Sequence, residues 1–359
     1  MNTDQYTQRN AIVELMRQPA EHRDTGWVQD AVQQAILLEL ATLPPYLCGL
    51  WSIDTSSGDT QVFHTLREII FDEMSHLGIA CNLLTAIGGT PRLASETLVP
   101  AYPGPLPGGV RPELRVYLSG LTMDSVRMYA SIEEPDTPVT HAALAGYTSI
   151  GAFYTAILDA FRANPQMITG KRQVTMDMEH HGLGNTLERL ETLGDVESAI
   201  AVIKEQGEGT SASPQNPYPG APGEFAHYYA FQEILHKQKL QQQPGQPDKW
   251  DFTGAAVPWP EHLWPMGVVP QGGWPRTGPD APTPEVTGFL DAFNRAYSDL
   301  LSLLEQAWQE ELSGSAEDLL QDAVVKMGAL RSPAGKLMKI ALPDGSGNNY
   351  GPEFRYLAP

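Results

Sequence analysis

The segment from Gln61 to Ile87 constrains this chain most, because it has the pattern of a long helix with two ionisable residues on its apolar face. At 100° per residue, Glu73 and His76 lie in the middle of a stripe of leucine, isoleucine and alanine side chains. Burying a carboxylate and an imidazole there costs on the order of several kcal/mol unless each finds a partner. The segment therefore predicts either a buried ion pair between Glu73 and His76 or a metal ion that both residues bind.

A second carboxylate lies on the apolar face of the preceding helix, which the periodicity predicts from Thr25 to Thr42. It belongs to Glu39, and neither stripe carries a lysine or an arginine. Two such carboxylates would repel each other unless one were protonated or both bound a cation. Four-helix carboxylate proteins bind two metal ions with one glutamate on each of two helices and Glu-x-x-His on each of the other two. Because Glu39, Glu73 and His76 supply half of that set, a metal site becomes as good an interpretation as an ion pair.

The second half of the chain offers a further inward-facing histidine. In a helix expected at residues 225–240, His227 shares the face of Ala230 and other apolar residues. Glu233 and His236 also form a Glu-x-x-His pattern, but they point well away from that face. His227 is therefore the preferred candidate ligand of this helix.

Two further candidates remain open on the residues alone. Glu208 ends a helix expected at residues 196–208, and the glycines on either side of it leave its direction undecided between the core and solvent. Glu179, His180 and His181 lie in a segment without periodicity, which favours a surface loop over a ligand set.

The remaining segments predict a mostly helical chain with long irregular connections. Proline lacks the N–H group that a helix needs, so Pro44 and Pro45 should end the first helix. Residues 93–140 contain many prolines and glycines, which predicts a long crossover with one short helix near residues 123–129. A third helix is expected at residues 148–161.

The C-terminal part should begin with a coil and end with two helices. Residues 244–284 are rich in proline and glycine and should pack through tryptophans, namely Trp250, Trp259, Trp264 and Trp274. Two helices follow, and Ser315 with Asp318 resembles a capping box that opens the second. The chain shows little strand signal anywhere.

The composition excludes several classes of partner. The chain has 359 residues, 42% of them apolar, and a formal net charge of −20, which argues against nucleic acid or an anionic lipid surface as a partner. No apolar run approaches the length of a membrane span, and no secretion signal is recognisable, so a soluble cytoplasmic protein is expected. Cys48 and Cys81 are expected to be reduced thiols in the core.

Five spaced motifs resemble the ferritin-like family, in the branch of the iminophenyl-pyruvate dimer synthases of the violacein and indolocarbazole pathways. The motifs are Glu39-Leu-Ala-Thr-Leu-Pro-Pro-Tyr46, Asp72-Glu73-Met-Ser-His76-Leu, Ser149-Ile-Gly-Ala-Phe-Tyr154, Gln206-Gly-Glu208-Gly and His227-Tyr-Tyr-Ala-Phe231. The resemblance covers about the first 240 residues, which correspond to the ferritin-like portion of those longer synthases. The tail Gly351-Pro-Glu-Phe354 is similar too.

The resemblance implies an all-α fold in which residues 1–245 form a ferritin-like four-helix bundle and residues 246–359 add the coil and the C-terminal helices. It also implies a set of iron ligands, namely Glu39, Glu73, His76, Glu208 and His227. Residues 210–223 would be an insertion that separates the last two of these ligands. Ala152 stands where the family pattern has a glutamate, so one terminal ligand is missing and a second iron should bind weakly or not at all.

The expected function is that of a metal-dependent enzyme that uses dioxygen to oxidise or oxidatively couple a small aromatic or amino-acid-derived metabolite. Tyr46 and Tyr154 lie near the ligands in sequence, where they could orient the substrate or relay a proton, or simply pack. One alternative is a metal-dependent condensation or cyclisation without a redox step. Another is a scaffold or binding protein that has lost full metal binding. A homodimer is one option for its assembly.

Overall fold

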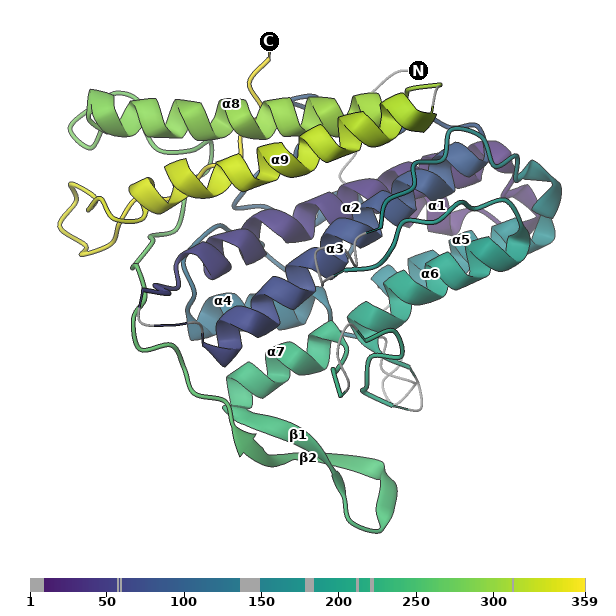
Figure 1. Ribbon diagram of the computed structural model, residues 1–359, viewed down its shortest axis with the longest axis horizontal. Helices are drawn as coiled ribbons and strands as arrows, with labels where there is room; N and C mark the ends of the chain where they lie inside the picture. Colours follow the sequence, from purple (N-terminus) through teal and green to yellow (C-terminus); the bar gives the residue numbers. More distant parts are fainter. Residues whose placement is uncertain are drawn as a thin grey trace.

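Two long helices, α2 (Thr25–Trp51) and α3 (Gln61–Ala86), form the middle layer of the protein, and helices cover them on both sides (Figure 1). The computed structural model describes residues 10–56, 58, 60–135, 149–177, 184–210, 213–219, 223–311 and 313–358. On one side lie α8 (Pro284–Ala307) and α9 (Ser313–Leu337). On the other side lie four shorter helices, α4 (Met123–Ile132), α5 (Ile150–Ala163), α6 (Leu193–Glu208) and α7 (His227–His236). The mostly helical fold predicted by the sequence is confirmed.

The four shorter helices form two pairs that face different halves of α2 and α3. In one pair α5 contacts α2 and α6 contacts α3, and in the other α4 contacts α2 and α7 contacts α3. A four-helix bundle has one helix that packs against α2 and one that packs against α3. Here α4 and α5 together take the place of the first, and α6 and α7 together take the place of the second. Glu133 caps the end of α4, and His227 begins α7. Both of these helix ends lie next to Glu73, near the middle of α3.

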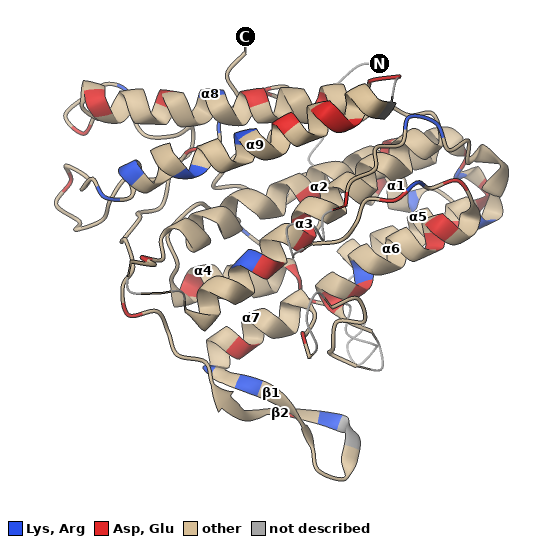
Figure 2. Ribbon diagram, in the orientation of Figure 1, with Lys and Arg blue, Asp and Glu red and all other residues tan. Residues whose placement is uncertain are grey.

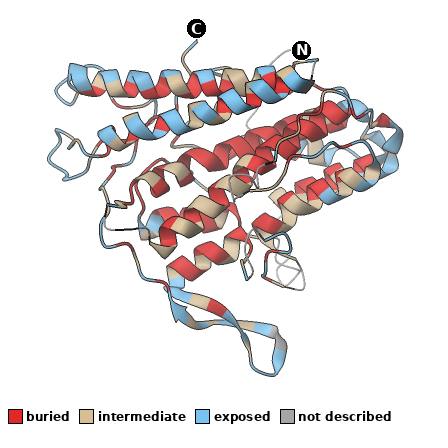
Figure 3. Cartoon of the chain, viewed as in Figure 1, coloured by how far each residue is buried: buried red, intermediate tan, exposed pale blue. Residues whose placement is uncertain are grey.

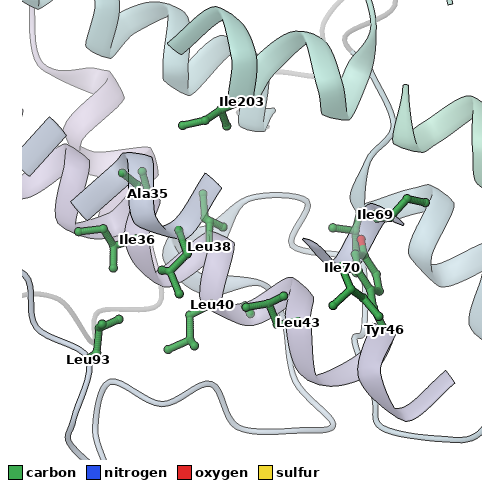
Figure 4. Packing of buried hydrophobic residues seen from close by; sticks show 14 of the residues in the cluster. Ala35, Ile36, Leu38, Leu40, Leu43, Tyr46, Ile69, Ile70, Leu93 and Ile203 are labelled. Atoms are coloured by element: carbon green, nitrogen blue, oxygen red, sulfur yellow. The ribbon is translucent and has the colours of Figure 1, made fainter. Parts of the chain in front are cut away.

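The middle layer is buried on most of its surface because other helices lie on both sides of it (Figure 3). Residues 32–50 of α2 include one charged residue, Glu39, whereas charged positions are frequent on the surrounding helices and loops (Figure 2). Figure 4 shows Leu40 and Leu43 of α2 with Ile69 and Ile70 of α3, which all belong to one apolar cluster. The apolar character of α2 around much of its circumference follows from this double coverage.

The expected end of the first helix at Pro44 and Pro45 is wrong, because α2 continues to Trp51. Pro45 has no N–H group to donate to the carbonyl of Ala41, four residues earlier. The hydroxyl of Tyr102, in the long crossover, donates to that carbonyl at 2.7 Å. A tertiary hydrogen bond therefore satisfies a carbonyl that the proline leaves without a partner in the helix.

The other bundle helices lie close to where the sequence predicted them. α3 ends one residue before the predicted end, and α4 is the short helix expected within the crossover. α5 begins at Ile150 because the side chain of Ser149 accepts a hydrogen bond from the N–H of Ala152, as an N-cap does. α6 begins at Leu193, where Thr192 and Asp195 form a capping box.

The helix predicted at residues 225–240 is shorter than expected. α7 ends at His236, and Lys237 takes a left-handed conformation with a φ of 54°. The chain then forms an antiparallel hairpin of β1 (Gln238–Gln243) and β2 (Gln246–Ala256). The predictions of helix to residue 240 and of coil beyond residue 244 are therefore wrong for this segment.

The C-terminal helices pack on the middle layer as a pair. α9 begins at Ser313, so the prediction that Ser315 caps its start is wrong. The indole N–H of Trp308, at the end of α8, donates to the side-chain oxygen of Asn82 on α3 at 2.8 Å. Among the tryptophans of the segment between α7 and α8, Trp274 is buried and the others are half-buried.

The largest apolar cluster contains side chains from both sides of residue 245. Trp51, for example, stacks on Phe354 with 6.1 Å between ring centroids. The division into residues 1–245 and 246–359 stays a prediction.

Cys48 and Cys81 are free and buried, as expected. Within the described part of the chain, no helix combines the length and the apolar character needed to cross a membrane.

Candidate metal centre

The site is built from four helices that each bring one or two ionisable side chains to the same buried place. α2 supplies Glu39, α3 supplies Glu73 and His76, the end of α4 supplies Glu133, and the start of α7 supplies His227. All five residues are at most 7% exposed. The structure thus brings together four of the five predicted ligands and adds a glutamate that the sequence analysis did not identify.

The five residues form two groups that could each hold a metal ion, and Glu73 belongs to both. One group is Glu39, Glu73 and His76, and the other is Glu73, Glu133 and His227. In each group the ligand atoms all lie within 4.8 Å of one another. Oε1 of Glu73 lies 3.4 Å from Nδ1 of His76 and 3.0 Å from Nδ1 of His227. One carboxylate oxygen therefore stands between the two imidazoles.

The outer nitrogen of each histidine has its own acceptor. Nε2 of His76 lies 2.8 Å from Oε1 of Gln206, and Nε2 of His227 lies 3.2 Å from Oδ2 of Asp72. The Gln206 oxygen also accepts from the amide of Asn185, which fixes its orientation. Because these oxygens accept, each Nε2 carries a proton. Once the ring has lost its second proton, the lone pair of Nδ1 would face the carboxylates. Nδ1 of His227 has no hydrogen-bond partner among the described residues.

Each carboxylate has one oxygen held by a hydroxyl group and the other directed at a histidine. The hydroxyl donors and their acceptors are Tyr154 with Oε1 of Glu39 at 2.5 Å, Tyr46 with Oε1 of Glu133 at 2.6 Å, and Thr42 with Oε2 of Glu73 at 2.8 Å. The other oxygens of Glu39 and Glu133 lie 3.9 Å and 4.0 Å from the nearest histidine Nδ1. This donor set of three carboxylates and two imidazoles fits metal ions such as iron, manganese or zinc.

The two tyrosines predicted near the site are both part of it, one beside Glu39 and the other beside Glu133. Each is fully buried and donates to a terminal carboxylate, Tyr154 to Glu39 and Tyr46 to Glu133. Burial and the adjacent carboxylates raise the pKa of both phenols well above its ordinary value. Both hydroxyls therefore keep their protons at neutral pH and act as donors.

The charges of the site are strongly coupled. Burial and repulsion from Glu73 raise the pKa of Glu39 to about 8 and that of Glu133 to about 7. Burial alone would lower the pKa of His76, but Glu73 beside it raises that pKa to about 9. Burial also opposes ionisation of Glu73, but its pKa is lowered because His227 and His76 flank it. Without a metal ion, protons therefore supply the positive charge that these buried carboxylates need.

Glu208 lies at the edge of the site and outside both ligand groups. Its Oε1 accepts a hydrogen bond from the N–H of Gly151 at 2.9 Å. A side chain at Gly151 would meet this carboxylate, so glycine leaves room for it. Glu208 and Lys204 help to line a pocket of about 420 Å³, including its mouth, that reaches Glu39, Glu73, His76 and Glu133. Glu179, His180 and His181 lie outside the described residues.

Glu133 was not predicted because α4 is a short helix within a crossover rich in proline and glycine, where the helical pattern is weak. Glu133 lies four residues after Tyr129 and seven after Val126, so all three share a face of α4. Val126 and Tyr129 are fully buried, and the same face count that found Glu39 would have found Glu133. Gly207 leaves room for this carboxylate, since a Cβ at that position would lie 3.2 Å from Oε2 of Glu133.

Comparisons with known proteins agree with this architecture. A family model described as ferritin-like matches residues 32–236, a range that contains all five residues of the two ligand groups. The crystal structure of a ferritin-like protein from Caulobacter vibrioides is similar to this chain, with a TM-score of 0.60 and 20% sequence identity. The likeness covers 92% of this chain and 97% of that one, and at this identity it concerns the fold. The comparison with curated proteins found no match.

Proposed function

This chain belongs to the ferritin-like family, and we propose that it is an enzyme whose buried centre binds two iron ions. The observation that carries the proposal is the position of Glu73, which belongs to both ligand groups and faces both histidines through one oxygen. Carboxylates and imidazoles on the facing helices of a bundle are the ligands of di-iron and di-manganese proteins. In this assignment Glu39 and His76 would hold one ion, Glu133 and His227 would hold the other, and Glu73 would contribute to both. Glu133 would supply a terminal carboxylate in place of the one that Ala152 lacks, so we propose a second ion despite the weak second site expected from the sequence.

The proposed reaction is the oxidation or oxidative coupling of a small aromatic or amino-acid-derived metabolite with dioxygen. Bound iron would supply the redox chemistry with dioxygen. The protein would hold the terminal carboxylates in place through Tyr154 and Tyr46, whose hydroxyl protons are in hydrogen-bond contact with those ligands. The burial of the site would keep bulk water away from the reaction.

The substrate class rests on the pocket and on the resemblance to the iminophenyl-pyruvate dimer synthases. Isoleucine side chains, among them Ile132 and Ile203, give the pocket apolar walls that suit a small aromatic molecule. The ammonium group of Lys204, which donates to the hydroxyl of Thr155 at 2.9 Å, lies on a residue that lines the same pocket. It would attract the carboxylate of an amino-acid-derived substrate. The partners proposed here are therefore this small molecule and dioxygen.

Metal content tests the proposal directly. Protein loaded anaerobically with Fe(II) and freed of excess metal should contain about two irons per chain, and Glu73→Gln should lose most of both because Glu73 is shared. Glu133→Gln should retain about one. Glu208→Gln is the matched control from the pocket rim and should retain both. No iron in the unaltered protein, or full iron in Glu73→Gln, would overturn the assignment.

The Glu208 control also separates two ligand sets. If Glu208→Gln loses iron and Glu133→Gln does not, the ligand implied by the family motifs is correct and Glu133 is not a ligand.

Dioxygen uptake by the iron-loaded protein, measured with and without aromatic amino-acid-derived compounds, then tests the redox step. Uptake that no such compound stimulates would contradict the proposed reaction.

A single-ion reaction without a redox step is the second candidate. One metal ion could be held by Glu39, Glu73 and His76 without the second group. Carboxylate and imidazole ligands also suit zinc or manganese. One ion there could act as a Lewis acid in a condensation or cyclisation. Full turnover with zinc in place of iron and without dioxygen would favour this candidate. A protein that keeps its function as Glu73→Gln would instead be a scaffold or binding protein.

A further inference from the structure

An apolar cavity lies on the other side of the middle layer from the metal centre. It has a volume of about 850 Å³, including its opening, and lies between α2 and α3 on one side and α8 and α9 on the other. Leu40 and Met74, each next in sequence to a proposed metal ligand, line this cavity and not the metal-site pocket. The two pockets share no lining residue, so a molecule in the cavity would not touch the proposed metal ligands.

The cavity walls are apolar and adaptable. Most of the lining side chains are leucine or aromatic, and none of the lining residues within the described ranges carries a charge. Three methionines, Met74, Met176 and Met327, enter the cavity wall from α3, from the segment after α5 and from α9. Methionine side chains adapt to the shape of a ligand because they are flexible and polarisable. The enclosed part of the cavity has a volume of about 90 Å³, so a bound ring compound would extend from this part into the opening.

One polar group on this wall has no partner. Tyr297 of α8 is 3% exposed and lines the cavity, and its hydroxyl has no hydrogen-bond partner among the described residues. The other hydroxyl on the wall, that of Ser75, donates to the carbonyl of Asp72 at 2.7 Å. An unpaired buried hydroxyl is unfavourable, and a ligand that hydrogen-bonds to it would remove that penalty.

We propose that this cavity is a binding site for a neutral, largely hydrocarbon molecule with one hydrogen-bonding group, which pairs with the hydroxyl of Tyr297. An alcohol or a ketone with an aromatic or alkyl body has this chemistry. A carboxylate or a protonated alkylamine does not, because its charge would meet no opposite charge among the described residues of the wall. The site is independent of the proposed metal centre, and binding is expected with or without iron.

Three ligands of the same shape test the chemical class. N-phenyl-1-naphthylamine, a neutral dye that fluoresces in apolar surroundings, should bind the full-length protein. Naphthalene, 1-naphthol and 1-naphthoate are then added as competitors. We expect 1-naphthol to displace the dye best, naphthalene less well and 1-naphthoate least. Absence of dye binding, or displacement by 1-naphthoate as good as by 1-naphthol, would overturn the proposal.

Two tryptophan substitutions on α9 test the location. Val324 lines the cavity, so Val324→Trp should fill it and abolish dye binding. The matched control is Val325→Trp, because Val325 is the next residue of the same helix and is 65% exposed. It should bind the dye as the unaltered protein does. Equal dye binding by the two variants would place the dye elsewhere and contradict the proposal.

Tyr297→Phe tests the polar contact and keeps the proposal testable if Val324→Trp does not fold. The variant should lose the preference for 1-naphthol over naphthalene, about 3- to 10-fold for one hydrogen bond, while naphthalene binding stays the same or improves. Circular dichroism and iron content serve as checks that the fold is retained. An unchanged preference in Tyr297→Phe would show that this hydroxyl does not contact the ligand.

Discussion

The two ring nitrogens of each site histidine have different surroundings, and this difference is the clearest sign of a metal centre among the individual residues. Nδ1 faces carboxylates in both His76 and His227, while Nε2 meets Gln206 in one case and Asp72 in the other. Metal-binding histidines commonly donate their second N–H to such an oxygen, which fixes the ring orientation and raises its basicity. Gln206 and Asp72 are therefore positioning residues for the two ligands.

Replacing Gln206 should weaken metal binding without unfolding the protein. In Gln206→Leu the Nε2–H of His76 loses its acceptor, so we expect metal affinity to fall about 10- to 100-fold. The control is Glu205→Leu, a half-buried neighbour on α6 with no part in the two ligand groups. Titration with a competing chelator measures the affinities. Equal affinities for the two variants would contradict the positioning role.

Metal binding should release protons and should strengthen as pH rises. The pKa of His76 is raised to about 9 and that of Glu39 to about 8, so both are largely protonated at pH 7 in the metal-free protein. A metal ion must displace those protons, and this competition weakens as pH rises through 8 and 9. Calorimetric titrations at pH 7 in buffers with different ionisation enthalpies should report a net release. An affinity that is constant between pH 6 and 9 would be inconsistent with these pKa values.

Much of the site could be predicted from residue patterns, and there are physical reasons why its other residues could not. Glu39, Glu73, His76 and His227 were found because each interrupts an apolar stripe of regular helical spacing. Glu133 lies at the end of a helix of ten residues in a segment rich in prolines and glycines, where fewer than three helical turns leave only a short apolar stripe. Gln206 and Asp72 act through other residues, and no single-sequence pattern distinguishes such partners from ordinary polar residues.

At the scale of elements, the double proline of α2 shows how tertiary contacts override a local rule. Proline usually ends or kinks a helix because it removes a hydrogen bond and crowds the preceding turn. Here Tyr102 donates to the carbonyl of Ala41, and Tyr129 donates to that of Pro45 at 2.8 Å. Gly49 lets Tyr129 approach, since a Cβ at that position would lie 2.7 Å from its hydroxyl. Both tyrosines come from the crossover, so the periodicity of α2 could not reveal them.

A double-mutant cycle tests this account of α2. Tyr102→Phe should destabilise the protein by about 1–3 kcal/mol because the buried carbonyl of Ala41 loses its donor. In a Pro45→Ala background the same change should cost less, since the new N–H can donate to that carbonyl. Urea denaturation measures both costs, and Tyr117→Phe is the half-buried control. Identical costs in the two backgrounds would contradict the account.

The β1–β2 hairpin was missed for a different reason. β1 is rich in glutamine and has one apolar residue, Leu240, so it lacks the usual period-two signal. In β2 a polar and apolar alternation is confined to residues 249–253. The residues between the strands, Pro244 and Gly245, do form a turn signal, and Gly245 has the positive φ of 75° that such a turn uses. The turn and a short strand after it could have been predicted, but not β1.

For the molecule as a whole, bound metal should raise the temperature of unfolding. A ligand that binds only the folded state stabilises it, by about 2.7 kcal/mol at a concentration of 100 times its Kd. Differential scanning calorimetry should therefore show a higher midpoint for the iron-loaded protein than for the same sample treated with chelator. Glu73→Gln, which should lack both ions, should show no such difference. A chelator effect of equal size in that variant would mean that the stabilising ion binds elsewhere.

The packing of α8 and α9 against the middle layer has a consequence for how the protein is made. Ribosomes produce α2 and α3 well before the helices that cover one apolar face of them, which lie more than 190 residues later in the sequence, at residues 284–337. Phe354, which stacks on Trp51, follows later still. Until those residues emerge, the nascent chain must carry this uncovered surface through a crowded solution, where exposed apolar surface promotes aggregation. Slow translation between α3 and α8 should therefore increase the need for chaperones.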